Sequence, residues 1–148
     1  MPKVLILLGS KSDQPYADDC AALLNTLGIE STTEVSSAHR KPTQTAKLAT
    51  TAAENGFEVI IAMAGLSAAL PGVAAAHSLL PVIGVPLPAA LGGIDALLAS
   101  VQMPPGIPVA TVTIGTPGAK NAAVLAARIL AIKYPQVHSA LAKHRDAL

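Results

Sequence analysis

Short apolar runs alternate with helix-like segments along the whole of this chain. The first run, at residues 3–8, consists almost entirely of Val, Leu and Ile and stops at Gly9. A short apolar run bounded by glycine is typical of a strand buried on both faces of a sheet. Because strands and helices alternate, the pattern predicts an α/β fold with one five-stranded parallel sheet covered by helices on both faces. The strands are expected at residues 3–8, 29–35, 57–62, 81–85 and 108–114, and the helices at residues 13–27, 42–55, 67–79, 94–101, 119–132 and 135–146.

The length and charge content of the chain indicate how many domains it has and whether it forms an oligomer. Its 148 residues contain no linker, repeat or low-complexity segment, so one domain over residues 1–148 is expected. The last helix, residues 135–146, is polar enough to be a surface or interface element. Only 13% of the residues are charged, whereas 51% are hydrophobic. A chain with so few charges is expected to hide apolar surface between subunits, which favours a homo-oligomer.

Composition also argues against several classes of function. A net charge of +1 and an aromatic content of 2% indicate neither a nucleic-acid groove nor a base-stacking platform. The nearly uncharged stretch 59–98 is interrupted too often by Gly and Pro to span a membrane. The apolar run at 3–8 is too short for a secretory leader. The single Cys20 cannot form an internal disulfide, so it favours a cytoplasmic protein, and it is expected to be a packing residue rather than a nucleophile.

Ligands of parallel α/β sheets bind at the carboxyl ends of the strands, so the loops that follow the strands are where functional residues are expected. The loop after the first strand contains Ser10, Ser12 and Asp13. Its hydroxyls and free backbone N–H groups precede a helix, an arrangement that favours an anion, and Asp13 suits sugar hydroxyls. The alternative is that Ser12 or Asp13 is an ordinary helix N-cap. The Gly-Lys-Ser/Thr spacing of a phosphate-binding P-loop is absent.

The loop after the second strand holds Ser37, His39 and Arg40. An imidazole titrates near neutral pH and suits proton transfer, and a guanidinium fork suits a phosphate. The alternative is a solvated His followed by an Arg at a helix start. We favour the functional interpretation because the pair lies at the ligand-binding edge of the predicted sheet.

The loop after the third strand, residues 64–72, is composed almost entirely of small residues. Such a loop lets backbone N–H groups approach a ligand closely, although tight packing of a helix on the sheet would favour the same residues. The turns at 84–93 and 102–106 are rigid and could wall a pocket. No His/Cys cluster has zinc spacing and acidic residues are sparse at strand ends, so no metal is expected. The residues alone thus predict a domain that binds an anionic, sugar-containing ligand and has one acid/base residue.

The sequence resembles the N5-carboxyaminoimidazole ribonucleotide mutase family over nearly its whole length. The matching motifs are Gly-Ser-Lys-Ser-Asp at 9–13, Ser-Ala-His-Arg at 37–40, Leu-Pro-Gly at 70–72, Pro-Val-Ile-Gly-Val-Pro at 81–86 and Val-Gln-Met-Pro at 101–104. The resemblance implies a flavodoxin-like three-layer sandwich and a homo-octamer with sites between subunits. It implies no metal and no organic cofactor, and a ribonucleotide substrate with a carbamate on its exocyclic nitrogen.

The family's site residues transfer to matching positions of this chain. The resemblance implies that His39 is the general acid/base. It implies that the first loop holds the ribose and phosphate end of the substrate and that the second contacts phosphate. The third loop would line the pocket for the carboxylate or carbon dioxide. The substrate-binding residues implied in this way are Ser10, Ser12, Asp13, Ser37, Arg40, Ala64, Gly65, Leu66 and Ser67.

One position departs from the family pattern. Most bacterial mutases carry a His just before Leu-Pro-Gly, whereas this chain has Ala69. Ser67 and Ala69 resemble the animal-type enzymes, which carboxylate aminoimidazole ribonucleotide with free carbon dioxide, but Arg40 resembles the mutases. We expect a mutase and keep three alternatives open. These are the carbon-dioxide-dependent carboxylase, a related carboxylase acting on another mononucleotide, and a flavodoxin-like binding module without turnover.

Overall fold

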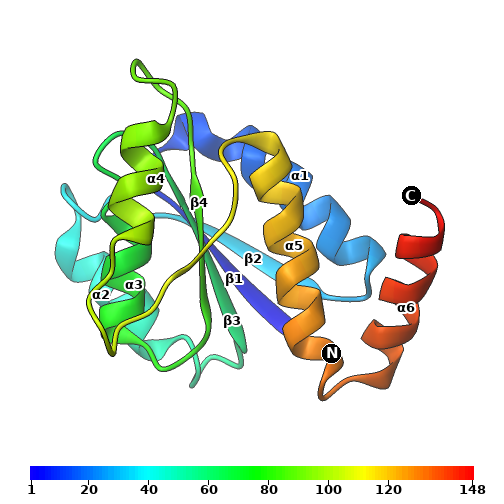
Figure 1. Cartoon of the computed structure of the whole chain (residues 1–148). Helices are drawn as coiled ribbons and strands as arrows, with labels where there is room; N and C mark the ends of the chain where they lie inside the picture. The colour runs from blue at the N-terminus through cyan, green and yellow to red at the C-terminus, as the bar shows by residue number, and fades with distance from the viewer.

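The computed structural model describes residues 1–148 and shows a five-stranded, fully parallel sheet between two layers of helices (Figure 1). The sheet order is β2-β1-β3-β4-β5, the order of flavodoxin-like folds. The predicted fold class is therefore confirmed. The strands are β1 (Lys3–Leu8), β2 (Glu30–Val35), β3 (Val59–Ala64), β4 (Val82–Pro86) and β5 (Ala110–Thr111).

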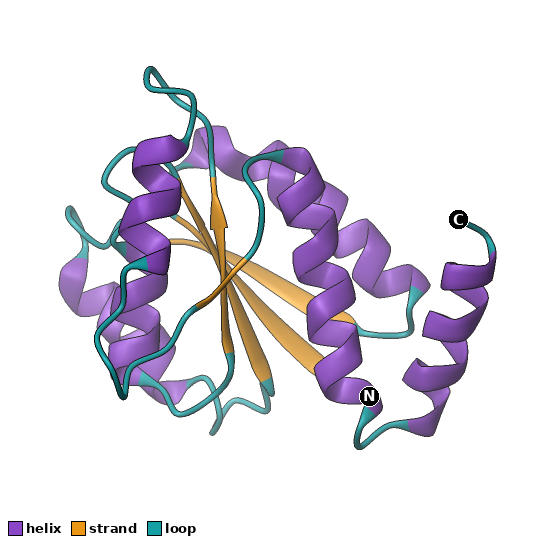
Figure 2. Cartoon of the chain, in the orientation of Figure 1, coloured by secondary structure: helices purple, strands orange, loops and turns teal.

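The helices divide between the two faces of the sheet (Figure 2). A short 3₁₀ turn, η1 (Lys11–Asp13), leads into the first α-helix. One face is covered by α1 and α5, with α6 packed on the outside of α5. The other face is covered by α2, α3 and α4. The helices are α1 (Gln14–Thr26), α2 (Pro42–Thr51), α3 (Leu70–His77), α4 (Ile94–Val101), α5 (Thr116–Ala131) and α6 (Pro135–Asp146).

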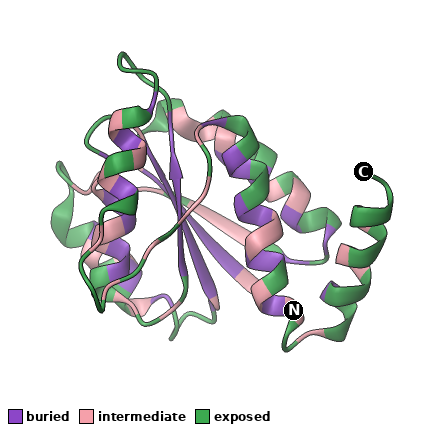
Figure 3. Ribbon diagram, viewed as in Figure 1, coloured by how far each residue is buried: buried purple, intermediate pink, exposed green.

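The apolar run of β1 supplies both halves of the core. Val4, Ile6 and Leu8 point to the cluster under α1 and α5, whereas Leu5 and Leu7 point to the cluster under α2 and α3. Successive side chains of a strand point to opposite faces, so a strand covered on both sides must be apolar at every position. Figure 3 shows that the central strands are buried along their length.

Cys20 lies within the α1 side of this core and is fully buried. Burial raises the pKa of its thiol to about 12. The thiolate, which is the nucleophilic form, is thus strongly disfavoured. The structure confirms that Cys20 is a packing residue.

Several element boundaries differ from the prediction. The third helix begins at Leu70 and not at residue 67, because Leu66 and Ala68 have positive φ angles of 54° and 30°, which a right-handed helix cannot contain. The fifth strand is confined to two residues and not seven, although Val112 N still donates to the Gly84 carbonyl at 3.0 Å. The second helix ends at Thr51 rather than at residue 55.

The helix α6 is attached through the turn that precedes it. Tyr134 Oη and Lys133 Nζ donate to the Glu58 carboxylate at 2.5 and 2.9 Å. Burial alone would raise the pKa of Glu58, but these two hydrogen bonds, together with the positive charges of Lys133 and the N-terminus, lower that pKa. Val137 is buried against the core, while most other side chains of α6 are exposed.

No helix combines the length and apolar character needed to cross a bilayer.

Candidate functional site

A cleft of about 440 Å³ lies at the carboxyl ends of β1, β2, β3 and β4. Its walls are the loops that follow these four strands. In the sheet, β2 lies on one side of β1 and β3 lies on the other, so the direction in which strands are added reverses at β1. Folds of this kind bind ligands beside that reversal, at the carboxyl ends of the strands. The lining residues are Gly9, Ser10, Ser12, Asp13, Ser37, Ala38, His39, Arg40, Ala64, Gly65, Leu66, Ser67, Ala68, Ala69, Leu70, Leu87, Pro88 and Ala89.

The first loop presents two hydroxyls and one carboxylate. Ser10 Oγ and Ser12 Oγ are 3.0 Å apart, and Ser10 Oγ also accepts from the Ser12 N–H at 3.4 Å, as the N-cap of η1. Asp13 makes no side-chain cap bond to α1. Burial raises the pKa of its carboxyl, although a backbone hydrogen bond at Ser10 opposes the shift. The capping alternative named Ser12 or Asp13, but neither side chain caps a helix: Ser10 caps η1 instead, and the Asp13 carboxylate stays available to a ligand.

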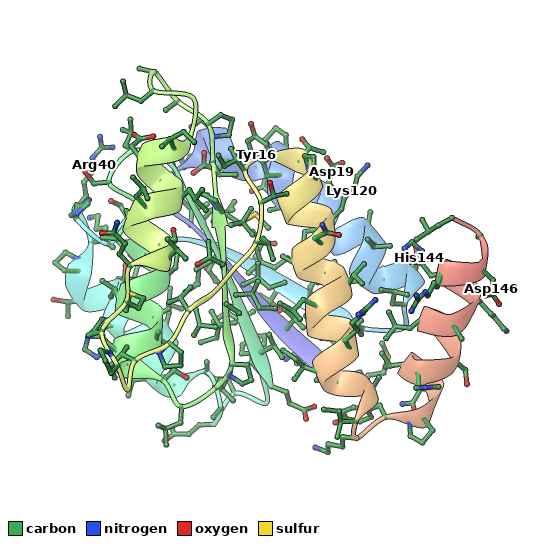
Figure 4. All side chains as sticks on the ribbon, viewed as in Figure 1. Tyr16, Asp19, Arg40, Lys120, His144 and Asp146 are labelled. Carbon is green, nitrogen blue, oxygen red and sulfur yellow. The ribbon has the colours of Figure 1, made fainter.

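The second loop is a tight turn with His39 near its apex. Lys41 N donates to the Ser37 carbonyl at 2.8 Å, and Arg40 N donates to Ser37 Oγ at 3.1 Å. The turn therefore encloses Ala38, His39 and Arg40, and the His39 and Arg40 side chains are exposed. Figure 4 shows Arg40 on the loop ahead of α2, on the opposite side of the molecule from His144 on α6. An exposed imidazole and an exposed guanidinium thus lie next to each other in the lining of the cleft.

The third loop brings backbone into the cleft. A Cβ placed on Gly65 would lie 3.3 Å from the Leu87 carbonyl oxygen, so the loops after β3 and β4 approach each other closely here. Two non-glycine residues, Leu66 and Ala68, have positive φ angles. Such backbone conformations are costly and cluster at functional sites. The Leu66 side chain is 61% exposed although it is apolar.

All ten residues proposed from the sequence line this one cleft. Several other lining residues are not among those ten, most clearly Leu87, Pro88 and Ala89 from the loop after β4. The rigid turn at 84–93 is the one sequence signal for them, but nothing in its residue types indicates contact with a ligand. The parallel pairing of Ala64 with Pro86 is what brings this loop to the cleft.

A larger hollow of about 930 Å³ lies between α1, α5 and α6 and contains none of the predicted residues. Lys120, Arg128 and Arg145 line it, so basic residues that are scattered in sequence gather there in space. It shares no lining residue with the cleft. Outside the cleft, His77 is exposed at the end of α3, which fits a surface or interface residue better than a packing residue. No three His, Cys, Asp or Glu side chains form a metal-ligating group.

The raised pKa of Asp13 predicts a stability cost for its charge. A carboxyl whose pKa is higher in the folded state destabilises that state above the folded pKa, and the cost disappears as pH falls to the unfolded value of about 3.9. We expect Asp13→Asn to raise the thermal unfolding midpoint at pH 7 and to lose this gain toward pH 4. Asp19→Asn, at an exposed position of α1, is the control. Equal midpoints for Asp13→Asn and wild type at both pH values would contradict the prediction.

The sequence also matches known proteins over nearly its whole length. Residues 3–148 match the family model described as AIR carboxylase. An N5-carboxyaminoimidazole ribonucleotide mutase of Pyrococcus abyssi is 54% identical over 147 residues, which are 99% of this chain and 83% of that protein. The mutase of Escherichia coli K12 is 49% identical over 98% of this chain and 86% of its own length.

A solved structure extends the likeness to the backbone. The crystal structure of Treponema denticola PurE has a TM-score of 0.87 and 30% identity, covering 99% of this chain and 91% of that one. The family model, the relative from Pyrococcus abyssi and the solved structure each match this chain over nearly its whole length. The chain therefore belongs to the AIR carboxylase family, and enzymes named N5-carboxyaminoimidazole ribonucleotide mutase are among its relatives.

Proposed function

We propose that this enzyme converts N5-carboxyaminoimidazole ribonucleotide to 4-carboxy-5-aminoimidazole ribonucleotide in purine biosynthesis, as the names of its relatives suggest. One observation carries the proposal. A single cleft joins the exposed imidazole of His39, the Arg40 guanidinium, the polar residues of the first loop and a loop of small residues. Acid/base chemistry on an anionic nucleotide needs this combination.

The two polar loops would hold the nucleotide. Arg40 and the Ser37 hydroxyl would bind phosphate through charge-assisted and neutral hydrogen bonds. The hydroxyls of Ser10 and Ser12, already 3.0 Å apart, would receive the ribose and phosphate end together with Asp13. The base would then lie toward the loop after β3, next to His39.

The reaction would proceed by loss and recapture of carbon dioxide. His39 protonates the exocyclic nitrogen as the N–C bond of the carbamate breaks, which releases carbon dioxide and leaves aminoimidazole ribonucleotide. C4 of the imidazole then attacks the retained carbon dioxide, and His39 takes the C4 proton as the ring regains aromaticity. Ala64, Gly65, Leu66 and Ser67 would enclose the small neutral fragment and keep it near C4.

A carboxylase that uses free carbon dioxide is the competing proposal, and Ala69 supports it. Ala69 lines the cleft where most bacterial mutases are expected to carry a histidine. The deciding experiment supplies purified protein with each substrate separately. The mutase proposal requires product from the carbamate ribonucleotide without added bicarbonate. Product formed only from aminoimidazole ribonucleotide plus bicarbonate would assign the carboxylase.

We also propose a homo-oligomer, the octamer implied by the family resemblance, in the cytoplasm. Helix α4 carries an apolar stripe: Ile94, Leu98 and Val101 are 56%, 46% and 51% exposed and lie at helical spacing. The turn that leads into α4 contributes Leu91, which is 72% exposed, and begins beside the cleft residue Ala89. Exposed apolar residues that gather on one helix face and the turn before it are typical of a surface that is covered by another subunit.

A charge in this stripe should break the assembly. We expect Leu98→Glu to shift the protein to smaller species, because the carboxylate would have to be buried without a partner. Light scattering coupled to size-exclusion chromatography measures the mass. Ile132→Glu is the matched control, since Ile132 is 89% exposed at the end of α5, away from the stripe. An unchanged mass for Leu98→Glu, or a monomeric wild type, would remove α4 as the interface.

A further inference from the structure

One buried hydroxyl contacts both ends of the turn that carries His39. Thr45, in the first turns of α2, is completely buried. Its Oγ1 lies 2.9 Å from the Lys41 carbonyl oxygen and 3.3 Å from the Ser37 carbonyl oxygen. These two carbonyls flank the residues Ala38, His39 and Arg40.

A second buried hydroxyl lies beside that of Thr45. Ser36 Oγ is 2.6 Å from Thr45 Oγ1, and Ser36 is 1% exposed. Each hydroxyl has one proton. If Ser36 donates to Thr45, the Thr45 proton is shared between the two carbonyls, and both of these hydroxyls have partners. Ser36 N also donates to the Leu8 carbonyl at 2.8 Å, so the network is anchored to the end of β1.

The catalytic ring has little else to hold it. Neither the His39 imidazole nor the Arg40 guanidinium makes a side-chain hydrogen bond or salt bridge, and both side chains are exposed. Their positions therefore depend on the backbone of the turn. That backbone is closed by the Lys41 N–H to Ser37 carbonyl bond and by the hydroxyl of Thr45.

We propose that Thr45 is a positioning residue for His39: its buried hydroxyl bridges the Ser37 and Lys41 carbonyls and holds the turn in the geometry that proton transfer needs. The inference rests on the proposed function, since it assigns His39 as the acid/base. Proton transfer requires heavy atoms within hydrogen-bond reach, and a displacement of about 1 Å can cost about 100-fold in rate.

The test compares threonine-to-valine changes at two positions of α2. Thr45→Val keeps the shape and removes the hydroxyl, so we expect kcat to fall about tenfold or more while KM changes less than about threefold. Thr45→Ser restores the hydroxyl and should recover kcat to within about threefold. Thr50→Val is the matched control, because Thr50 Oγ1 makes the same kind of bond, to the Ala46 carbonyl at 2.8 Å, away from the turn.

A second control separates positioning from general loss of stability. Ser36→Ala removes the other half of the buried hydroxyl pair but leaves the bonds from Thr45 to the turn carbonyls. It should lower the unfolding midpoint yet keep kcat within about threefold. Equal kcat losses in Thr45→Val and Ser36→Ala, or no loss in Thr45→Val, would overturn the inference.

Hydrogen exchange keeps this test independent of activity. The Lys41 amide closes the turn, so Thr45→Val should speed its exchange, whereas Thr50→Val should not. If wild type turns over neither ribonucleotide, the proposed function fails, while the exchange result still decides whether Thr45 holds the turn. Unchanged exchange in Thr45→Val would refute the bridging role directly.

Discussion

Replacing His39 with asparagine is expected to lower turnover at least about 100-fold, the low end for loss of a general acid/base. Asparagine keeps a polar side chain of similar reach but cannot gain or lose a proton near neutral pH. Because His39 is exposed and makes no side-chain hydrogen bond, the fold should be unaffected. Affinity for the nucleotide should stay within about tenfold, roughly 1.4 kcal/mol, since the proposed phosphate and ribose contacts come from other residues.

Steady-state kinetics and calorimetric titration with the ribonucleotide measure the two quantities separately. His138→Asn is the control: His138 is exposed on α6, far from the cleft, and should retain wild-type turnover. Full turnover by His39→Asn would remove this residue from the mechanism. Loss of binding together with turnover would instead make His39 a binding residue.

Much of the fold follows from local sequence pattern. A strand such as β1, apolar at every position, can only be buried on both faces, and this places helices on both sides of the sheet. The order of strands and helices then restricts the topology to a few right-handed parallel arrangements. For the same reason, loops that follow strands converge, so sequence reasoning alone predicts that Ser10, His39 and Gly65 lie near one another, as they do in the cleft.

Other features depend on contacts between distant residues. No local signal places Leu66 and Ala68 in positive-φ conformations, since neither residue type favours them, and this is why sequence pattern starts α3 too early. In the edge strand β5, only Ala110 and Thr111 pair with β4. The sequence does not reveal how many residues of this segment pair with the neighbouring strand. The basic hollow formed by α5 and α6 likewise needs the packing of two helices to appear.

The Thr45 network shows the same limit inside the candidate site. Four threonines in α2 look alike in the sequence, and three of them donate to the carbonyl four residues earlier. Only Thr45 faces the core and reaches a second carbonyl, in the loop that ends β2. Helical periodicity indicates which face is buried, but the partner on the next element becomes known only once the loop is placed.

Gly118→Ala is expected to destabilise the protein by about 3 kcal/mol, a large effect for one methyl group. Gly118 lies in the first turn of α5, where a Cβ would overlap the backbone carbonyl of Thr113. A carbonyl in the main chain cannot rotate away as a side chain can, so either α5 or the segment after β5 must shift. For a chain of this size the loss corresponds to a fall of roughly 6–12 °C in the unfolding midpoint.

Gly72→Ala is the matched control, because Gly72 is also helical and its added Cβ would meet only the Met103 thioether, 3.2 Å away at Sδ. A flexible methionine can move, so this change should cost less than about 1 kcal/mol. Intrinsic helix propensity would make both substitutions favourable by about 1 kcal/mol. Thermal unfolding at one protein concentration distinguishes the two effects. A stabilised Gly118→Ala protein would mean that helix propensity outweighs the steric overlap. A large loss of stability in Gly118→Ala but not in Gly72→Ala would show that α5 packs directly against the Thr113 carbonyl.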